Sequence, residues 1–186
     1  MDQPGISESI AFSRPPEVPG VEILAADHTR RLFRVYHETY TLCIGTGGEW
    51  IYRQRTRLTK PGEVMLIEPG ELHVATTLIG GVVRFRVAFI DPGEIGRVAA
   101  DIGNLPALPH LALANVENDR LLFDRLAQFF ASLEQPSSIL ERQSRLTAAV
   151  GWILQRYTET GLRSVRSGRE PGDVCANTFM STTPTP

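Results

Sequence analysis

The chain has little of what marks secreted, membrane or self-sufficient DNA-binding proteins. It carries only two cysteines, Cys43 and Cys175, and we expect no disulfide because cytosolic proteins rarely keep one. Lys60 is the single lysine and the net charge is −2, whereas DNA-binding domains usually present a strongly basic face. No apolar run approaches the roughly 20 residues of a membrane-spanning helix. The N-terminus lacks the basic start and apolar block of a secretory signal, so we expect a cytoplasmic protein.

Proline and glycine are concentrated at the start of the chain. Four prolines and two glycines fall within residues 1–20, a composition that builds neither a helix nor an inner strand. We therefore predict a flexible N-terminal arm over 1–20. Phe12, beside Ile10 and Ala11, forms the one large apolar cluster of this arm.

Residues 21–91 have the pattern of short β-strands. Runs rich in Val, Ile, Phe, Tyr and Thr alternate with turn residues such as Pro61-Gly62 and Pro69-Gly70. The predicted strands are 21–26, 31–36, 39–45, 49–54, 63–68, 73–79 and 82–90. Short strands at this spacing favour a sandwich or a barrel. Residues 92–115 have a loop-like composition, with a short helix predicted near 94–101.

The apolar period then changes from two to between three and four. Leucines and phenylalanines recur at helical spacing in 117–133, which predicts an amphipathic helix. A second helix is predicted from Ser138 to about Thr160, because Ser138 and Glu141 have the spacing of a capping box and Gly161 suits a helix end.

The second predicted helix carries a short heptad seam. Its members are Leu146, Val150, Ile153 and Tyr157. One interpretation is that this seam packs on the strands and on helix 117–133. The other is that it meets the same helix of a second subunit, which makes these four residues a candidate dimer interface.

Three blocks of the sequence resemble a known family. The phrase from His37 to Leu42 precedes a glycine turn, the stretch from Lys60 to His73 places an apolar strand between two Pro-Gly turns, and 84–92 is an aromatic strand. Their order is similar to that of the sensor domains of AraC-type transcription regulators. The resemblance implies a mainly β fold, a cupin-like (jelly-roll) β-barrel over 21–115 followed by two antiparallel α-helices over 116–161 that serve dimerisation.

The resemblance to AraC-type regulators also suggests an interpretation of residues 162–186. Full-length members of the family continue through a linker into a DNA-binding domain of two helix-turn-helix units. Val174 to Met180 is similar to the start of that domain, so we interpret 162–186 as a linker and a truncated start of it. The alternative is an unrelated disordered tail.

A barrel with His37 and His73 raises the question of a metal. Metal-binding cupins typically present two histidines and a carboxylate from the first block and one histidine from the second. Here Thr39 takes the place of the second histidine, and Glu38, next to His37 on a strand, points to the opposite face. Two ligands fall short of the usual three, so we expect neither a metal nor another cofactor.

The remaining candidates belong to an effector-binding pocket. Aromatic rings can stack on a ligand ring, arginines can clamp a carboxylate, and histidines can hydrogen-bond a ligand. The candidate residues are His37, Tyr40, Trp50, Tyr52, His73, Arg84, Arg86 and, from an arm that folds over the effector in some relatives, Phe12. The alternatives are core packing for Tyr40 and Trp50, a solvated outer face for the arginines, and a structural role for His73.

These observations predict a binding module and not an enzyme. The resemblance implies that it senses a small molecule, a sugar or a small organic acid or aromatic compound, and forms a homodimer. It would control transcription only with a helix-turn-helix DNA-binding half, or act by pairing with intact partners and disabling them. The competing hypothesis is a small metal-dependent cupin enzyme, such as a dioxygenase or an isomerase.

Overall fold

Short strands and a few helices build the part of the chain that a computed structural model describes, residues 7–29, 34–46, 48–52, 55–76, 83–103, 109–111, 115–116 and 118–158. The strands form a six-stranded and a four-stranded sheet, with every pair of neighbours antiparallel. In the first sheet the order is β1 (Ser9–Ser13), β2 (Val21–Thr29), β9 (Val83–Ile90), β4 (Tyr40–Gly45), β7 (Val64–Ile67) and β10 (Asn115–Val116). In the second it is β3 (Arg34–Val35), β8 (His73–Thr76), β5 (Gly48–Tyr52) and β6 (Arg55–Thr59).

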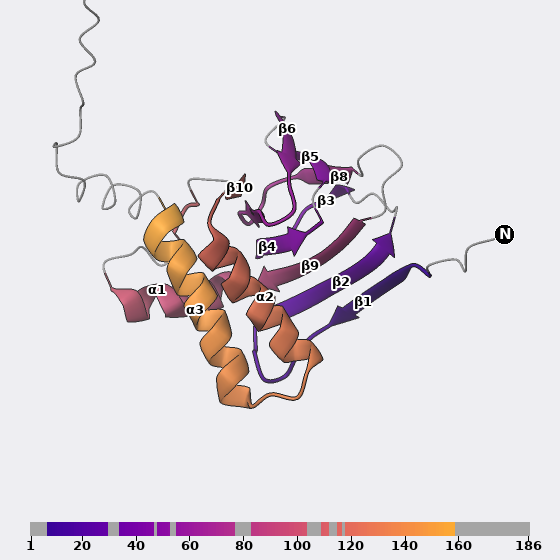
Figure 1. Ribbon diagram of the computed structural model, residues 1–186. Helices are drawn as coiled ribbons and strands as arrows, with labels where there is room; N and C mark the ends of the chain where they lie inside the picture. The colour runs from indigo at the N-terminus through magenta and orange to yellow at the C-terminus, as the bar shows by residue number, and fades with distance from the viewer. Residues whose placement is uncertain are drawn as a thin grey trace, which may run out of the picture.

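The prediction of a jelly-roll barrel needs one correction. The described strands form two separate sheets and do not close into a barrel by hydrogen bonding. The fold is therefore cupin-like and mainly β, with the two sheets packed over one another (Figure 1). The two Pro-Gly turns are confirmed, because Gly62 and Gly70 have φ values of 91° and 81°, a region that glycine enters without steric strain.

Three strands were not predicted from the sequence: β1, β6 and the two-residue β10 at the end of the stretch with loop-like composition. β6 lies in a run of arginine and threonine without the alternation that marks a half-buried strand. β1 lies within the predicted arm and pairs with β2 at the edge of the sheet, with all five of its residues exposed. The predicted break after Ala26 is instead a bulge, where β2 continues through His28 at a φ of 55°. The flexibility of residues 1–20 stays a prediction.

The described residues hold three helices, one more than the two predicted to follow the barrel. They are α1 (Pro92–Ile102), which confirms the short helix expected near 94–101, α2 (Arg120–Glu134) and α3 (Ile139–Tyr157). The Ser138 side chain accepts a hydrogen bond from the Glu141 N–H, as the capping box predicts. The Glu141 carboxylate, however, pairs with Arg145 one turn on. Gly161 and the predicted segment 162–186, including Cys175, lie outside the described residues.

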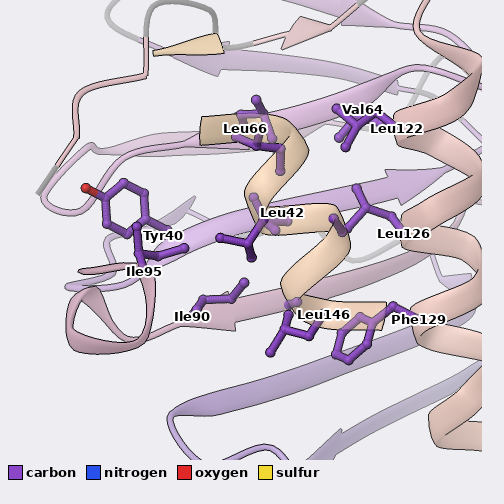
Figure 2. Close-up of a cluster of buried hydrophobic side chains, with 14 of the residues drawn as sticks. Tyr40, Leu42, Val64, Leu66, Ile90, Ile95, Leu122, Leu126, Phe129 and Leu146 are labelled. Carbon is purple, nitrogen blue, oxygen red and sulfur yellow. The ribbon is translucent and has the colours of Figure 1, made fainter. Parts of the chain in front are cut away.

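The main core lies between the helices and one face of the six-stranded sheet, which we call the outer face. α2 and α3 run antiparallel, since Arg125 bonds the carbonyl of Ala148 and Arg145 bonds that of Gln128. Figure 2 shows Leu122, Leu126 and Phe129 of α2 beside strand residues of this face. All three have no exposed surface. The helices and the strands therefore share one hydrophobic core.

The predicted dimer seam is part of this core. Leu146, Val150 and Ile153 are 2%, 1% and 3% exposed in the single chain, which leaves them no surface to offer a second subunit. Tyr157 is partly buried and donates a hydrogen bond to Asp119. The burial of Leu146, Val150 and Ile153 fits the alternative, packing on the strands and on α2, and dimerisation stays a prediction.

Candidate functional site

The register of the six-stranded sheet arranges the opposite face, here called the inner face, in rows. Residues paired directly across antiparallel strands share a face. One row, the polar row, runs Glu22, Phe89, Thr41 and Ile67. The next, the apolar row, runs Phe12, Leu24, Val87, Cys43 and Met65. The inner face looks toward the four-stranded sheet, because Trp50 of β5 packs on Ile67 and Met65.

Two histidines meet at the polar row. The ring centroid of His37 lies 4.3 Å from that of Phe89 and 5.6 Å from that of His73. The turn at Pro69-Gly70 fixes this arrangement, because the Gly70 N–H donates to the carbonyl of His37 at 2.8 Å and His73 follows three residues later. The two predicted histidines are thereby brought together, His37 from the connection between β3 and β4 and His73 from β8.

The histidines present neutral rings. Burial lowers the pKa of both, and the nearby His73 lowers that of His37 further, against a smaller opposing effect of Glu22. The Nδ1 of His73 lies 3.2 Å from the carbonyl oxygen of Glu71. Because a carbonyl only accepts, we assign the proton to Nδ1, which leaves the lone pair of Nε2 as a hydrogen-bond acceptor.

Two threonine hydroxyls near the histidines have no partner. The side-chain oxygens of Thr39 and Thr41 are buried and make no hydrogen bond, and Thr41 as a whole is only 2% exposed. A buried polar group left unpaired costs about 1–3 kcal/mol, so most such groups in proteins are satisfied. The polar row therefore offers hydrogen-bonding capacity that the protein itself does not use.

The arm contributes to the rim of this face. Phe12 stands at the edge of the apolar row and is 55% exposed. The guanidinium of Arg14 lies 5.9 Å from the ring of Phe12 and bonds the carboxylate of Glu22 at 2.6 Å. Phe12 of β1 thus brings an aromatic ring to this side of the inner face, and Arg14, just after β1, forms an ion pair there with Glu22 of β2.

The donor set does not fit a catalytic metal. Among the described residues no group of three His, Cys, Asp or Glu side chains lies close enough to hold an ion. His37 and His73 supply two nitrogens, and Thr39, in the place of the second histidine, is a poor ligand. The expectation that the protein uses no metal stays a prediction.

Three of the predicted effector residues lie on the other side of the sheet. Tyr40 is 4% exposed in the outer core and donates to the carbonyl of Pro109 at 2.9 Å, and burial raises its pKa to about 12. Arg84 and Arg86 alternate with Phe85 and Val87 and so share the outer face. This placement removes all three from the histidine cluster and fits the core-packing and outer-face alternatives.

The two arginines line a shallow groove beside α2. It has a volume of about 280 Å³ and is walled by the ends of β4 and β9 and by Phe123, Ala127, Phe130, Ala131 and Glu134 of α2. Arg86 bonds both oxygens of Asp27, the carboxylate of Glu134 and two backbone carbonyls. Its donors are used within the protein, so it does not offer the free clamp that the sequence suggested.

Of the two aromatic residues of β5, Trp50 has a described side chain and Tyr52 does not. Trp50 is 2% exposed, packs in the inner cluster and donates from Nε1 to the hydroxyl of Thr59 at 2.8 Å. Tyr52 pairs with His73 in the register, and its side chain lies outside the described part. Sequence reasoning missed Glu22, Thr41 and Phe89, although the alternation of each with outer-face neighbours could have indicated them once one face was fixed.

Comparison with known proteins places this fold. A ToxT variant from Vibrio cholerae strain SCE256, in its apo form, has a TM-score of 0.53 at 8% identity over 73% of this chain. This chain corresponds to 54% of the length of ToxT, about half. A cupin 2 conserved barrel protein from Salinispora arenicola CNS-205 has a TM-score of 0.41 at 17% identity, covering 48% of this chain and 81% of its own. A comparison with curated proteins found no match.

Two antiparallel sheets that pack on one another, with helices over the outer face of the larger one, give the chain a cupin-like fold. A family model, the AraC-like ligand binding domain, matches residues 18–150, which is most of the chain. The chain belongs to this family of AraC-like ligand-binding domains. In the part that the structure describes, no helix is both long and apolar enough to cross a membrane.

Proposed function

We propose that this chain is the effector-sensing and dimerisation module of an AraC-type transcription regulator, and that a small molecule binds on the inner face beside His37, Phe89 and Thr41. The observation that carries the proposal is the unpaired, buried hydroxyl of Thr41. A ligand that hydrogen-bonds this group recovers the free energy that the empty protein lacks. Leu24, Cys43 and Met65 of the apolar row are partly buried, so part of each side chain stays accessible to a ligand.

The proposal describes a binding module and not an enzyme. The inner face offers aromatic, apolar and hydrogen-bonding groups, which suffice to bind a small molecule. Among the described residues it presents two histidines and no third ligand close to them, which is one fewer than a catalytic metal usually needs. Elemental analysis of purified protein tests this distinction, since stoichiometric Fe, Mn, Ni or Zn would favour the enzyme hypothesis.

The site is tested by locating ligands on the protein. Methyl groups of Thr41, Met65 and Ile67 report on the inner face, whereas Ile44 and Ala127 report on the groove beside α2. We expect hits from a library of neutral, anionic and cationic fragments to shift the inner-face methyl signals. Hits confined to Ile44 and Ala127 would contradict the proposed site.

A pair of threonine variants sharpens this test. Thr41→Val removes the unpaired hydroxyl, and Thr56→Val, on exposed β6, removes a hydroxyl at the surface. We expect inner-face hits to weaken in Thr41→Val and to bind unchanged in Thr56→Val. Equal affinities in both variants would show that Thr41 does not take part in binding.

Dimerisation and control of transcription are part of the same proposal. Because the heptad seam is buried, a second subunit would use exposed apolar residues, of which Ile139 and Leu140 at the start of α3 are 59% and 72% exposed. We propose that transcription is controlled through a helix-turn-helix DNA-binding half. Size-exclusion chromatography with light scattering is expected to show a dimer that Leu140→Asp weakens, and a monomer at high micromolar concentration would contradict it.

A further inference from the structure

We infer that the effector is an uncharged molecule with an apolar body and a single hydrogen-bond donor at one end, such as a phenol or an aromatic alcohol, and not a carboxylate or a phosphate ester. The inference rests on the proposed function, because it assigns a ligand class to the site proposed there. It is carried by the order of residues in the two rows of the inner face.

The polar row presents acceptors and lacks a free positive charge among the described residues. Glu22 of this row contributes a carboxylate, and His73 of β8, which lies near the row, contributes the lone pair of Nε2. The guanidinium of Arg14, which stands at the same rim, is already bonded to Glu22 at 2.6 Å. An anionic ligand would therefore find no unpaired positive charge to offset its lost hydration and would lie beside the Glu22 carboxylate, whereas a hydroxyl donor would find an acceptor.

The hydroxyls of Thr39 and Thr41 match the same kind of ligand. Each can donate and accept, and both are buried without a partner. A ligand hydroxyl can accept from one of them while it donates to a histidine lone pair. One small polar group is therefore enough to satisfy this end of the site.

The apolar row determines the other end of the ligand. Leu24, Val87 and Met65 are hydrocarbon or thioether side chains, and burial raises the pKa of the Cys43 thiol to about 12, so that it is uncharged. A molecule with a hydroxyl on every carbon would leave several of them unpaired against this row, which is unfavourable. Because the rows are two residues apart, about 7 Å at the usual rise of a strand, a single ring with its substituent spans them.

Three matched probes test the ligand class. Benzyl alcohol, benzyl methyl ether and benzoate share one ring and differ in donor capacity and charge. We expect benzyl alcohol to bind about fivefold more tightly than the ether, the value of one hydrogen bond. We expect benzoate to bind at least about tenfold more weakly than the alcohol, because of the like charge on Glu22. Affinities are measured by titration of the Thr41, Met65 and Ile67 methyl signals.

Variants identify the groups responsible. Thr41→Val is expected to reduce the preference for the alcohol over the ether, and Thr56→Val to leave it unchanged. Glu22→Gln is expected to strengthen benzoate binding and to leave benzyl alcohol nearly unaffected. Glu22→Gln also frees the guanidinium of Arg14, which would itself attract benzoate. The double variant Arg14→Gln, Glu22→Gln lacks this guanidinium, and we expect the gain for benzoate to persist in it.

The outcomes separate this inference from the proposed function. Benzoate binding at the inner-face methyls as tightly as benzyl alcohol would overturn the ligand class and leave the site intact. Binding of library sugars there, with none of the three probes, would also overturn the class alone. Failure of every library member and probe to shift the inner-face methyls would overturn the proposed site itself.

Discussion

The two faces of the six-stranded sheet differ in how completely the protein satisfies them. On the outer face Leu42, Val64 and Ile90 are at most 2% exposed, and they pack against three helices. Arg86 on that face is paired with Asp27 and Glu134. On the inner face Thr41 is buried without a partner, and Leu24 and Met65 are only partly buried.

This difference separates a structural face from a binding face. A core whose side chains are packed and whose polar groups are hydrogen-bonded stabilises the folded protein. A ligand-binding surface lacks some of these contacts in the ligand-free protein and gains them when the ligand binds. Alternation along β4 produces both from one strand, since Tyr40 and Leu42 point to the helices while Thr41 points inward. Mutations on the two faces should therefore have effects of different size and sign.

The largest expected effect is on the outer face. Phe129→Ala removes a ring that has no exposed surface, at the contact between α2 and the sheet. Loss of a fully buried phenylalanine costs about 3–5 kcal/mol in the free energy of unfolding. Urea unfolding measures the loss. The matched inner-face change is Met65→Ala, and its half-buried side chain should cost clearly less. Equal losses would contradict the contrast between the two faces.

Asp119 tests the polar contacts on the helix side. Its carboxylate accepts from the Leu122 N–H at the start of α2, and also from the Trp152 Nε1–H and the Tyr157 hydroxyl of α3. Burial, the largest single effect, raises the pKa of Asp119, but the three hydrogen bonds and the nearby charge of Arg156 together outweigh it and lower the pKa. Asp119→Ala removes a helix cap and leaves the two α3 donors without this acceptor, for which we expect a loss of about 2 kcal/mol.

The control for Asp119 keeps most of its geometry. Asp119→Asn retains an oxygen that can accept at the helix start but removes the charge. Its loss should be smaller than that of the alanine variant. Thermal unfolding of both variants at one pH compares them, and an alanine variant as stable as the wild type would show that the three contacts contribute nothing.

The inner face should be recognisable by its response to acid. The pKa values of His37 and His73 are lowered from 6.5 by burial, so the unfolded chain binds protons more readily than the folded one. Their contribution to stability is complete above pH 6.5 and is lost as the pH falls from there toward the lowered folded values. The slope is at most about 1.4 kcal/mol per pH unit for each histidine. Carboxylates such as Asp27 and Asp119, whose pKa values are lowered from 3.8, lose their contribution only in more acidic solution.

Variants assign this acid response to the histidines. His37→Phe keeps a ring beside Phe89 but cannot take up a proton, and His73→Asn keeps a donor for the carbonyl of Glu71. Denaturant unfolding at a series of pH values should show a flatter profile below pH 6.5 in each variant. An unchanged slope in the double variant would mean that other groups carry the response.

The sequence predicted the helices and strands better than it predicted the side of the sheet to which each residue points. Residue patterns predicted most strands, the short helix α1 and the cap at Ser138, because these depend on local spacing and turn chemistry. The resemblance to AraC-type sensors brought His37 and His73 together correctly. The side of the sheet to which Tyr40, Arg84 and Arg86 point was not predictable, because a period of two marks alternate faces without saying which one the helices cover.

The same limit applies to the heptad seam of α3. Leu146, Val150 and Ile153 have the spacing of a coiled coil, and that spacing is also what a helix needs to pack within its own domain. The strand β6 was missed for a different reason. Its arginines and threonines carry no apolar alternation, and its place is set by pairing with β5, which is a contact between strands and not a property of the run itself.

Thr41→Val has the smallest predicted effect on the free energy of unfolding, and it should raise this free energy where Phe129→Ala and Asp119→Ala lower it. Thr41→Val replaces a hydroxyl that is buried without a partner by a methyl group of similar size. In the free protein this change removes an unpaired polar group, so we expect unfolding to require up to about 1 kcal/mol more free energy than in the wild type. Thr56→Val, at an exposed position of β6, should change stability by less than about 0.5 kcal/mol. Urea unfolding of both without ligand makes the comparison. A loss of stability in Thr41→Val would mean that the protein or a bound water already satisfies the hydroxyl, and the inner face would then be as complete as the outer one.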